Sequence, residues 1–317
     1  MPEAPNNREI ASGSFAKLAR EGRLPPHSVP GGKSLAGADL TGAHLAGCDL
    51  RGVDFSEADC TRADFSNTNL EGANFSQAKL SGAQFGQSNL TRAGFVNAEA
   101  KNTMFLGCSL QGADLRGNFS GCLFQEPAAA DAKFAGGKFK QCSFRGASLP
   151  KADFAGCELE ACDFAAAFLE AASFKGASIK GADFTSANLK NAAFIGAKGK
   201  AVNFMNANCS GATFVDAALP SAVFMECNLE KSAFGNTDVS QGFFAQCNAT
   251  QAQFVKAKLV YADFAYARFA QTRFTGADLS GASLHATIES EADFSGANLK
   301  NVKRTDAELF AAENPKK

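Results

Sequence analysis

Cysteine, histidine and aspartate are the residues of this chain whose side chains could do chemistry. The ten cysteines could ligate a metal or form disulfides. Eight stand where the surrounding sequence otherwise has a small residue (Cys48, Cys108, Cys122, Cys142, Cys157, Cys162, Cys227 and Cys247), and two stand where it has a large apolar one (Cys60 and Cys209). We therefore interpret them as buried packing residues. No metal and no cofactor are predicted.

The histidines and aspartates do not form a catalytic arrangement. His27, His44 and His285 are far apart in the chain, and none has a Ser, Cys or acid at a spacing that would complete a triad. Aspartate often stands directly before a large apolar residue, as in Asp39, Asp49, Asp54, Asp64, Asp153, Asp163 and Asp183. Such regular use predicts hydrogen bonds to backbone corners rather than acid–base pairs. The sequence therefore predicts a protein that is not an enzyme.

A five-residue repeat must position all of these side chains. From Leu35 to Leu115 a large apolar residue, the central residue, recurs at nearly every fifth position, and a small residue, the minor residue, usually stands two places before it. One residue is lost in "DLRGNFSGCLF", after which the repeat resumes at Phe119 and runs to Leu299. A helix repeats every 3.6 residues and a strand every 2, so neither keeps both positions buried. The chain must turn a corner in every unit.

Four such corners close a square coil of about twenty residues, and neighbouring coils would stack at about 4.8 Å. The stretches "GADLTG", "EGANFSQ", "GADFTSANLKNAAF" and "GADLSGASL" have Ala, then Asp or Asn, then Leu or Phe, then polar residues. In these units the chain strongly resembles the pentapeptide-repeat family. The resemblance implies an all-β fold, a right-handed quadrilateral β-helix, and the number of units predicts a solenoid of about 14 coils.

Phenylalanine falls mainly at every second unit, which predicts aromatic columns on two opposite faces and aliphatic columns on the other two. The expected structural core includes Phe184, Leu189, Phe194, Phe204, Phe224 and Phe244.

Segments outside the repeat are expected to cover its ends, because an open end exposes apolar core and strand edges. Residues 1–32 are predicted to form a cap helix and a linker, with Ala11, Phe15 and Leu18 on one face of the helix. Residues 303–317 are predicted to be a C-terminal cap or tail. In it, a short helix would place Leu309 and Phe310 over the end.

Between the caps we expect two repeat blocks, at 33–117 and 118–302, with an irregular junction at 116–131. Pro127 stands there at a minor position and Ala129 at a central one. A bend or a small outward loop is expected around 117–134, and it is either a tolerated irregularity or a functional hinge.

Apolar residues at outward positions say most about function, because these positions are otherwise polar. On the face of Phe204, Phe224 and Phe244 we define an apolar stripe that consists of Met205, Val223, Met225, Phe243 and Tyr266. On the opposite face Ile195, Val215 and Val255 line up. Isolated apolar residues are ordinary on protein surfaces. Stacked coils would make the stripe contiguous, however, and we predict that it binds a partner protein or a second copy of the chain.

The charge pattern limits the class of partner. The net charge is -1, with 31 basic and 32 acidic residues interspersed, so no direct binding to nucleic acid or membrane is expected. The best-known activity of the resembled family is protection of a type II topoisomerase, DNA gyrase, by mimicry of DNA. Duplex DNA carries about one charge per 1.7 Å, and only Asp39 to Asp64 form an acidic region here. The N-terminus has no apolar signal region, which predicts a cytoplasmic protein.

The segment "SLHATIESEADFSGANLKNVKRTDAELFAAE", residues 283–313, resembles the closing part of pentapeptide-repeat proteins associated with type VI secretion. The resemblance is carried by Leu284 and His285, by Glu289 at a central position, and by the run from Thr305 to Leu309. It implies an accessory or adaptor role in effector loading or delivery, with a secretion effector or spike component as partner. The sequence thus predicts a non-enzymatic protein-binding scaffold, first in this context and alternatively as a gyrase-protecting DNA mimic.

Overall fold

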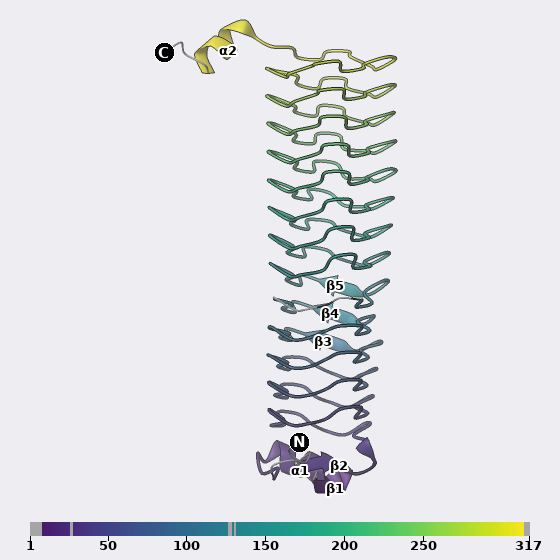
Figure 1. Cartoon of the computed structure of the whole chain (residues 1–317), viewed down its shortest axis with the longest axis vertical. Coiled ribbons are helices and arrows are strands. Elements are labelled where there is room, and N and C mark those ends of the chain that lie inside the picture. Colours follow the sequence, from purple (N-terminus) through teal and green to yellow (C-terminus); the bar gives the residue numbers. More distant parts are fainter. Residues whose placement is uncertain (1–7, 26–27, 126–128, 130, 314–317) are drawn as a thin grey trace, which may run out of the picture. The chain divides into compact units, whose positions relative to one another are not determined.

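The computed structural model describes residues 8–25, 28–125, 129 and 131–313. The chain divides into two compact units, Met1–Glu158 (unit 1) and Leu159–Lys317 (unit 2). Each unit is a stack of four-sided β-coils (Figure 1). The predicted fold, a right-handed quadrilateral β-helix, is therefore confirmed.

Parallel bridges join residues that lie one turn apart. Asp39 pairs with Asp59 in unit 1 and Asn203 pairs with Val223 in unit 2, so one turn takes twenty residues. Within each five-residue unit the chain turns by a bond such as that from the N–H of Ala43 to the carbonyl of Leu40, at 2.9 Å. The corner also requires a positive φ two places after the central residue, for example 55° at Asn67. This local geometry explains the five-residue period.

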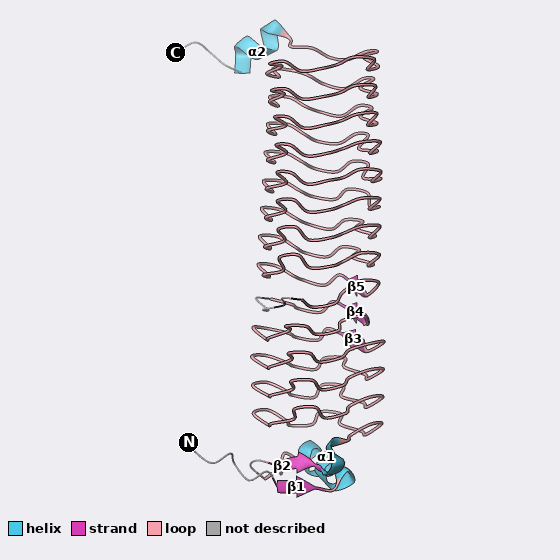
Figure 2. Ribbon diagram, turned by 45° about the vertical axis from the view of Figure 1, so that its right-hand side comes forward, coloured by secondary structure: helices cyan, strands magenta, loops and turns pink. Residues whose placement is uncertain are grey.

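Unit 1 begins outside the repeat. Strand β1 (Arg8–Ile10) pairs in parallel with β2 (Ser28–Pro30), and the 3-10 turn η1 (Gly31–Lys33) leads into the first coil (Figure 2). Helix α1 (Ser12–Arg20) lies between the two strands in sequence. Over the described residues, neither α1 nor the second helix of the chain has the length and apolar character needed to cross a bilayer.

Helix α1 docks on the first coil of unit 1. Phe15 and Ala19 are fully buried, and the carbonyl of Ala19 accepts a 2.9 Å hydrogen bond from the N–H of His44. Ala11, which we expected on the buried face, is exposed, and Leu18 is only half-buried. The short helix therefore forms, but its contact face is rotated from the predicted one toward Ala19.

The lost residue in the repeat is visible in the bridge pattern of unit 1. Strands β3 (Glu99–Lys101), β4 (Asn118–Ser120) and β5 (Lys138–Lys140) form a parallel sheet. Glu99 pairs with Asn118 at an offset of nineteen residues, whereas Asn118 pairs with Lys138 at an offset of twenty. The predicted slip is thus confirmed. Ala129 is buried, while Pro127 and the expected loop around it lie outside the described residues.

The core of unit 2 consists of stacked rings, and all six core residues named above are fully buried. The ring of Phe184 stacks on Phe164 and Phe204 at centroid distances of 4.9 and 5.1 Å. It also meets Phe174 and Phe194 edge to face at 5.3 and 5.6 Å. Phe184 thus contacts both its own column and the opposite one.

The last coil of unit 2 is not covered as predicted. Helix α2 (Ala307–Glu313) lies beside the coils rather than across them, and Phe310 is 42% exposed (Figure 1). A cap formed by Phe310 was therefore a wrong prediction, and the side chain of Leu309 lies outside the described residues. Instead the Arg304 guanidinium lies 5.5 Å from the centre of the Phe294 ring, and its Nη1 donates to Glu289 Oε2 at 2.7 Å. An ion pair at central positions covers this ring.

Candidate functional site

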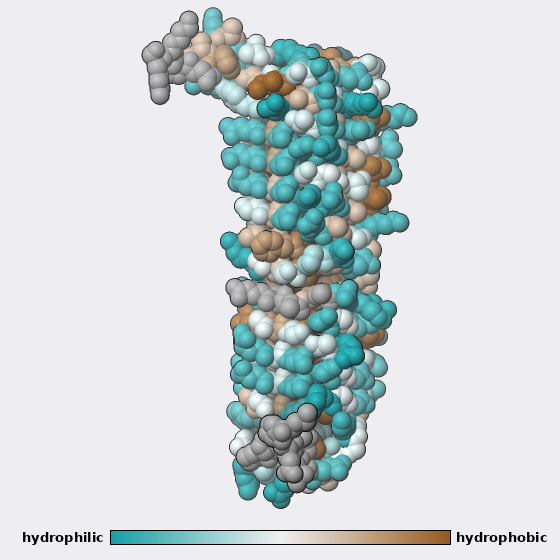
Figure 3. Space-filling view, viewed as in Figure 1, coloured by the Kyte–Doolittle hydropathy of each residue, from teal (hydrophilic) through white to brown (hydrophobic). Residues whose placement is uncertain are grey.

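Four residues of the apolar stripe lie together on unit 2. Val223 and Phe243 pair on adjacent coils. Met205 and Met225 are also one coil apart, since the N–H of Asn206 donates to the carbonyl of Met225 at 3.0 Å. Phe243 is 45% exposed and the other three side chains are half-buried. On the surface in view, hydrophobic residues gather only in small groups (Figure 3).

Tyr266, the fifth residue of the stripe, anchors helix α2. Its hydroxyl donates to the carboxylate of Glu313, which also bonds His285 Nε2 at 3.0 Å. These bonds, first from Tyr266 and then from His285, lower the pKa of Glu313. His285 is only 8% exposed, although its repeat position points outward, because α2 covers it. The structure therefore gives Tyr266 an intramolecular partner that the sequence did not reveal.

Other exposed apolar residues escaped the sequence reasoning. Phe168, Tyr261 and Ile288 of unit 2 are 58%, 67% and 59% exposed. All three occupy outward repeat positions, and that position was the signal that could have found them. They belong to columns other than those of the stripe, and Tyr261 lies over Gly281, where an added Cβ would be 2.4 Å from the ring. They do not extend the stripe.

Over six successive coils, the face that carries the stripe has charge of one sign only. We define face A as the outward residues around the central residues Phe164, Phe184, Phe204, Phe224, Phe244 and Phe264. Its charged residues are Asp163, Asp183, Glu226 and Asp263, and it has no lysine or arginine. The opposite face, around Phe174, Phe194, Phe214, Phe234, Phe254 and Phe274, carries Lys175, Lys256, Arg273 and a single acid, Asp216. An apolar patch framed by carboxylates thus distinguishes face A from the opposite face.

The regular aspartates have the corner role predicted for them. A side-chain oxygen accepts the N–H two residues later, at 2.8 to 3.0 Å, in Asp39, Asp54, Asp64, Asp153, Asp163 and Asp183. Asp49 instead accepts two bonds from the Arg51 guanidinium, at 2.8 and 2.7 Å. These carboxylates are therefore structural, and they define the repeat corners.

Acid should weaken the fold through such carboxylates, and Asp114 provides a test. The Arg116 guanidinium, bonded to both oxygens at 2.8 and 2.6 Å, lowers the pKa of Asp114 below its ordinary 3.8. A lowered folded-state pKa gives stability that is present above pH 3.8 and lost as the pH falls through the folded-state value. We expect the melting temperature to drop below about pH 4, and Asp114→Asn, which does not titrate, to flatten this drop. Identical pH profiles in circular dichroism melts would contradict the prediction.

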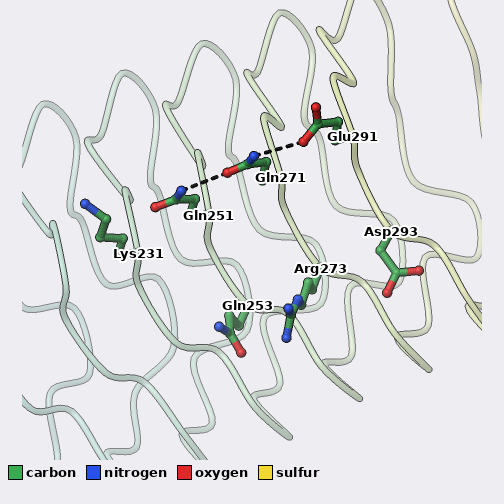
Figure 4. Close-up of a pocket in the computed structure, with 7 residues that line it drawn as sticks. All are labelled: Lys231, Gln251, Gln253, Gln271, Arg273, Glu291 and Asp293. Atoms are coloured by element: carbon green, nitrogen blue, oxygen red, sulfur yellow. Dashed lines mark hydrogen bonds between the residues drawn. The ribbon is translucent and has the colours of Figure 1, made fainter.

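A polar groove lies on another side of unit 2 (Figure 4). Gln251 donates to Gln271 at 2.8 Å, and Gln271 donates to Glu291 at 2.9 Å, each pair one coil apart. The other lining residues are Lys231, Gln253, Arg273 and Asp293. Figure 4 shows the row of bonded side chains following the coils.

The cysteines are placed as packing residues. Nine of the ten are buried. Burial raises the pKa of Cys108 and of Cys157 to about 12, which keeps these thiols protonated. Cys48, in the first coil, is only half-buried. Within the described part of the chain, no three His, Cys, Asp or Glu side chains gather in a way that could hold a metal ion.

Family models match most of the chain. A model described as a pentapeptide repeat region matches residues 38–115 and 147–224. A model of pentapeptide repeats in nine copies matches residues 119–163, and one in eight copies matches 244–276 and 277–312. No curated protein matches the chain.

Solved structures of pentapeptide-repeat proteins are among the similar folds. HetL from the cyanobacterium Nostoc sp. strain PCC 7120, involved in heterocyst differentiation regulation, is 20% identical, with 83% of this chain and 88% of HetL covered and a TM-score of 0.21. Full-length QnrB1, a plasmid-mediated fluoroquinolone resistance protein, is 18% identical, with 78% and 97% covered and a TM-score of 0.19. A protein from the thylakoid lumen of Arabidopsis thaliana is 28% identical, with 36% and 68% covered and a TM-score of 0.14.

Proposed function

Because this chain belongs to the pentapeptide-repeat family, we propose that it is a non-enzymatic scaffold that binds another protein through face A of unit 2. The observation that carries the proposal is the patch of Met205, Val223, Met225 and Phe243. It occupies outward positions that the repeat normally fills with polar residues, and its largest member is 45% exposed. Buried apolar contacts of this kind dominate the affinity of protein interfaces.

The rest of the surface supports a binding role more than a catalytic one. The recurring residues of the repeat have structural roles: aspartates bind corner N–H groups, and most phenylalanines at central positions and most cysteines are buried. What remains free to vary is the set of outward side chains. A stack of coils holds these side chains at fixed spacings, which suits recognition of a partner at little cost in ordering.

The proposal predicts that Met225→Ser together with Phe243→Ser weakens partner binding and leaves the fold intact. Two apolar side chains at an interface contribute about 1.5 to 3 kcal/mol each when fully buried, so we expect a loss of at least about tenfold in affinity. The measurement is quantitative pull-down with the tagged full-length chain, and sedimentation velocity for self-association. Ile195→Ser with Val255→Ser, on the opposite face, is the matched control. Full retention of both the partner and the oligomeric state by the face A variant would remove the proposal.

For the biological context we propose an accessory role in type VI secretion, with an effector or spike component as the partner. The resemblance of residues 283–313 to proteins of that system supports this choice. In the native host, the tagged chain should recover a secretion component. Recovery of face A-dependent partners that are unrelated to secretion would reject the context and retain the scaffold.

Gyrase protection by DNA mimicry is the alternative. The acidic region of unit 1 is partly neutralised, since Asp39 pairs with Arg20, and Asp49 with Arg51 at 2.7 Å. Face A of unit 2 is acidic but carries an apolar centre, unlike a phosphate backbone. A supercoiling assay with a quinolone separates the two functions, because protection at a sub-stoichiometric amount of protein would favour the mimic.

A further inference from the structure

We propose that face A of unit 2 binds a basic, amphipathic α-helix of its partner. This inference rests on the proposed function and adds the chemical class and the secondary structure of the partner segment. It is carried by three features of the face: the sign of its charges, their placement around the apolar patch, and the spacing of its coils.

The charges of face A select for a basic partner. Asp183, Glu226 and Asp263 frame the apolar patch, and face A has no lysine or arginine to compensate them. The two aspartates accept the N–H of Thr185 at 2.9 Å and of Ala265 at 3.0 Å through Oδ1. Their negative charge therefore stays at fixed places above and below the patch. Lysine or arginine on a partner would gain attraction here, and acidic groups would be repelled.

The same charges disfavour other classes of ligand. Duplex DNA, RNA and anionic lipid surfaces carry dense negative charge, which the carboxylates around the patch would repel. A partner surface that is apolar but uncharged would leave the carboxylates without a counter-charge. A segment with apolar residues in the middle and basic residues at the ends satisfies both features of the face.

The coil spacing favours a helix that lies along the columns. A continuous series of bridges joins Asp183, Asn203, Val223, Phe243 and Asp263. Its four coil steps of about 4.8 Å place the two aspartates about 19 Å apart, the length of about 13 helical residues at 1.5 Å each. Beneath the patch, Phe224 stacks on Phe204 at 4.7 Å and on Phe244 at 4.9 Å.

One turn of a helix rises 5.4 Å, so each turn of the partner would meet approximately one coil. Apolar residues on its two middle turns would then contact Met205, Met225 and Phe243. Basic residues near its two ends would reach Asp183 and Asp263, and one at its side would reach Glu226.

A peptide selection tests this inference with the full-length protein. A library of random 16-residue peptides is displayed and selected on the immobilised wild-type chain at low salt, and the enriched peptides are synthesised. We expect apolar residues at i, i+3, i+4 and i+7 with Lys or Arg toward both ends. We also expect helical circular dichroism when the peptide is bound. Enrichment of acidic, uncharged or non-helical peptides would overturn the inference, as would the absence of any enrichment.

A charge-neutral variant measures the contribution of the carboxylates. Asp183→Asn, Glu226→Gln and Asp263→Asn are combined, because asparagine keeps the corner bond, as Asn203 does to the N–H of Met205 at 3.0 Å. The peptide affinity should fall about tenfold at low salt and by less at high salt, since exposed ion pairs are screened. The matched control, Asp216→Asn with Glu230→Gln and Asp278→Asn, neutralises the same residue types on the other faces of unit 2. It should change the affinity by less than about twofold.

The variants separate a failure of this inference from a failure of the proposed function. If Met225→Ser with Phe243→Ser abolishes peptide binding and the charge-neutral variant does not, the basic-helix inference is overturned and the apolar interface stands. If neither variant weakens binding, both are overturned. Binding of duplex DNA or of phosphatidylserine vesicles that is lost in the charge-neutral variant would also overturn the basic-helix inference.

Discussion

Replacing Phe184 by aspartate should unfold the coils of unit 2 that surround this position. The ring is fully buried and contacts four other phenylalanines, two stacked at 4.9 and 5.1 Å and two edge to face at 5.3 and 5.6 Å. Loss of a buried Phe side chain costs about 3 to 5 kcal/mol, and a buried carboxylate without a partner adds several more. Because whole domains are stable by only about 5 to 15 kcal/mol, the coils around this position should not survive.

Thermal melts and limited proteolysis measure this loss of stability. Contacts in a solenoid are made mainly between neighbouring coils, so new cleavage sites should appear first between Phe164 and Phe204. Lys190→Asp puts the same side chain at an exposed position one unit later, and it should melt like the wild type. An unchanged melting profile for Phe184→Asp would show that the register assigned to this part of the repeat is incorrect.

The fold could be predicted because the same five-residue pattern recurs along most of the chain. Each unit places one large and one small residue inward. A unit that departs from this pattern can still be assigned from the register of the units beside it. The register of Phe184, Phe204 and Phe224 follows from counting in fives, as does the slip before Phe119. The corner role of Asp183 was predictable for the same reason, since its bond to the N–H of Thr185 is local.

The ends and the covered surface could not be predicted in this way, because they depend on contacts between segments distant in sequence. His285 stands at an outward repeat position, yet it is buried because Glu313 of α2 bonds both it and Tyr266. Arg304 covers the ring of Phe294, a role that the expected helical cap would have filled. Single events of this kind have no periodic signal, so only three-dimensional structure identifies them.

The candidate site could be predicted in part. The repeat predicts that Met225 and Phe243 lie on one face. It also predicts the grouping of the acidic residues, but this grouping is recognised only when the residues of each face are listed separately. Over the whole chain the basic and acidic residues nearly cancel, which conceals six successive coils of unit 2 that carry only negative charge on one face. For a solenoid, charge has to be counted face by face.

Gly117 lies at the slip in unit 1, and Gly117→Ala should destabilise that unit. In an ordinary corner an N–H donates to the carbonyl three residues back, as Ala113 does to Leu110 at 2.9 Å. At the slip, the N–H of Gly117 donates to Leu115 at 2.8 Å, only two residues back, which removes one residue from the coil. The backbone at Gly117 lies close to neighbouring backbone, and an added Cβ would be 2.8 Å from the carbonyl oxygen of Phe95.

That contact is with backbone, which cannot rotate away, and the same Cβ would lie 3.0 Å from both the carbonyl oxygen of Ala98 and the ring of Phe119. Overpacking of this kind costs about 1 to 3 kcal/mol. The melting temperature of unit 1 should fall by about 2 to 4 °C for each kcal/mol. Gly86→Ala is the matched control in the same unit, since its Cβ would meet only Ser66 Oγ at 3.8 Å. Gly117→Ala and Gly86→Ala are compared with wild type by calorimetry. Equal melting temperatures for all three would show that the slip does not require glycine.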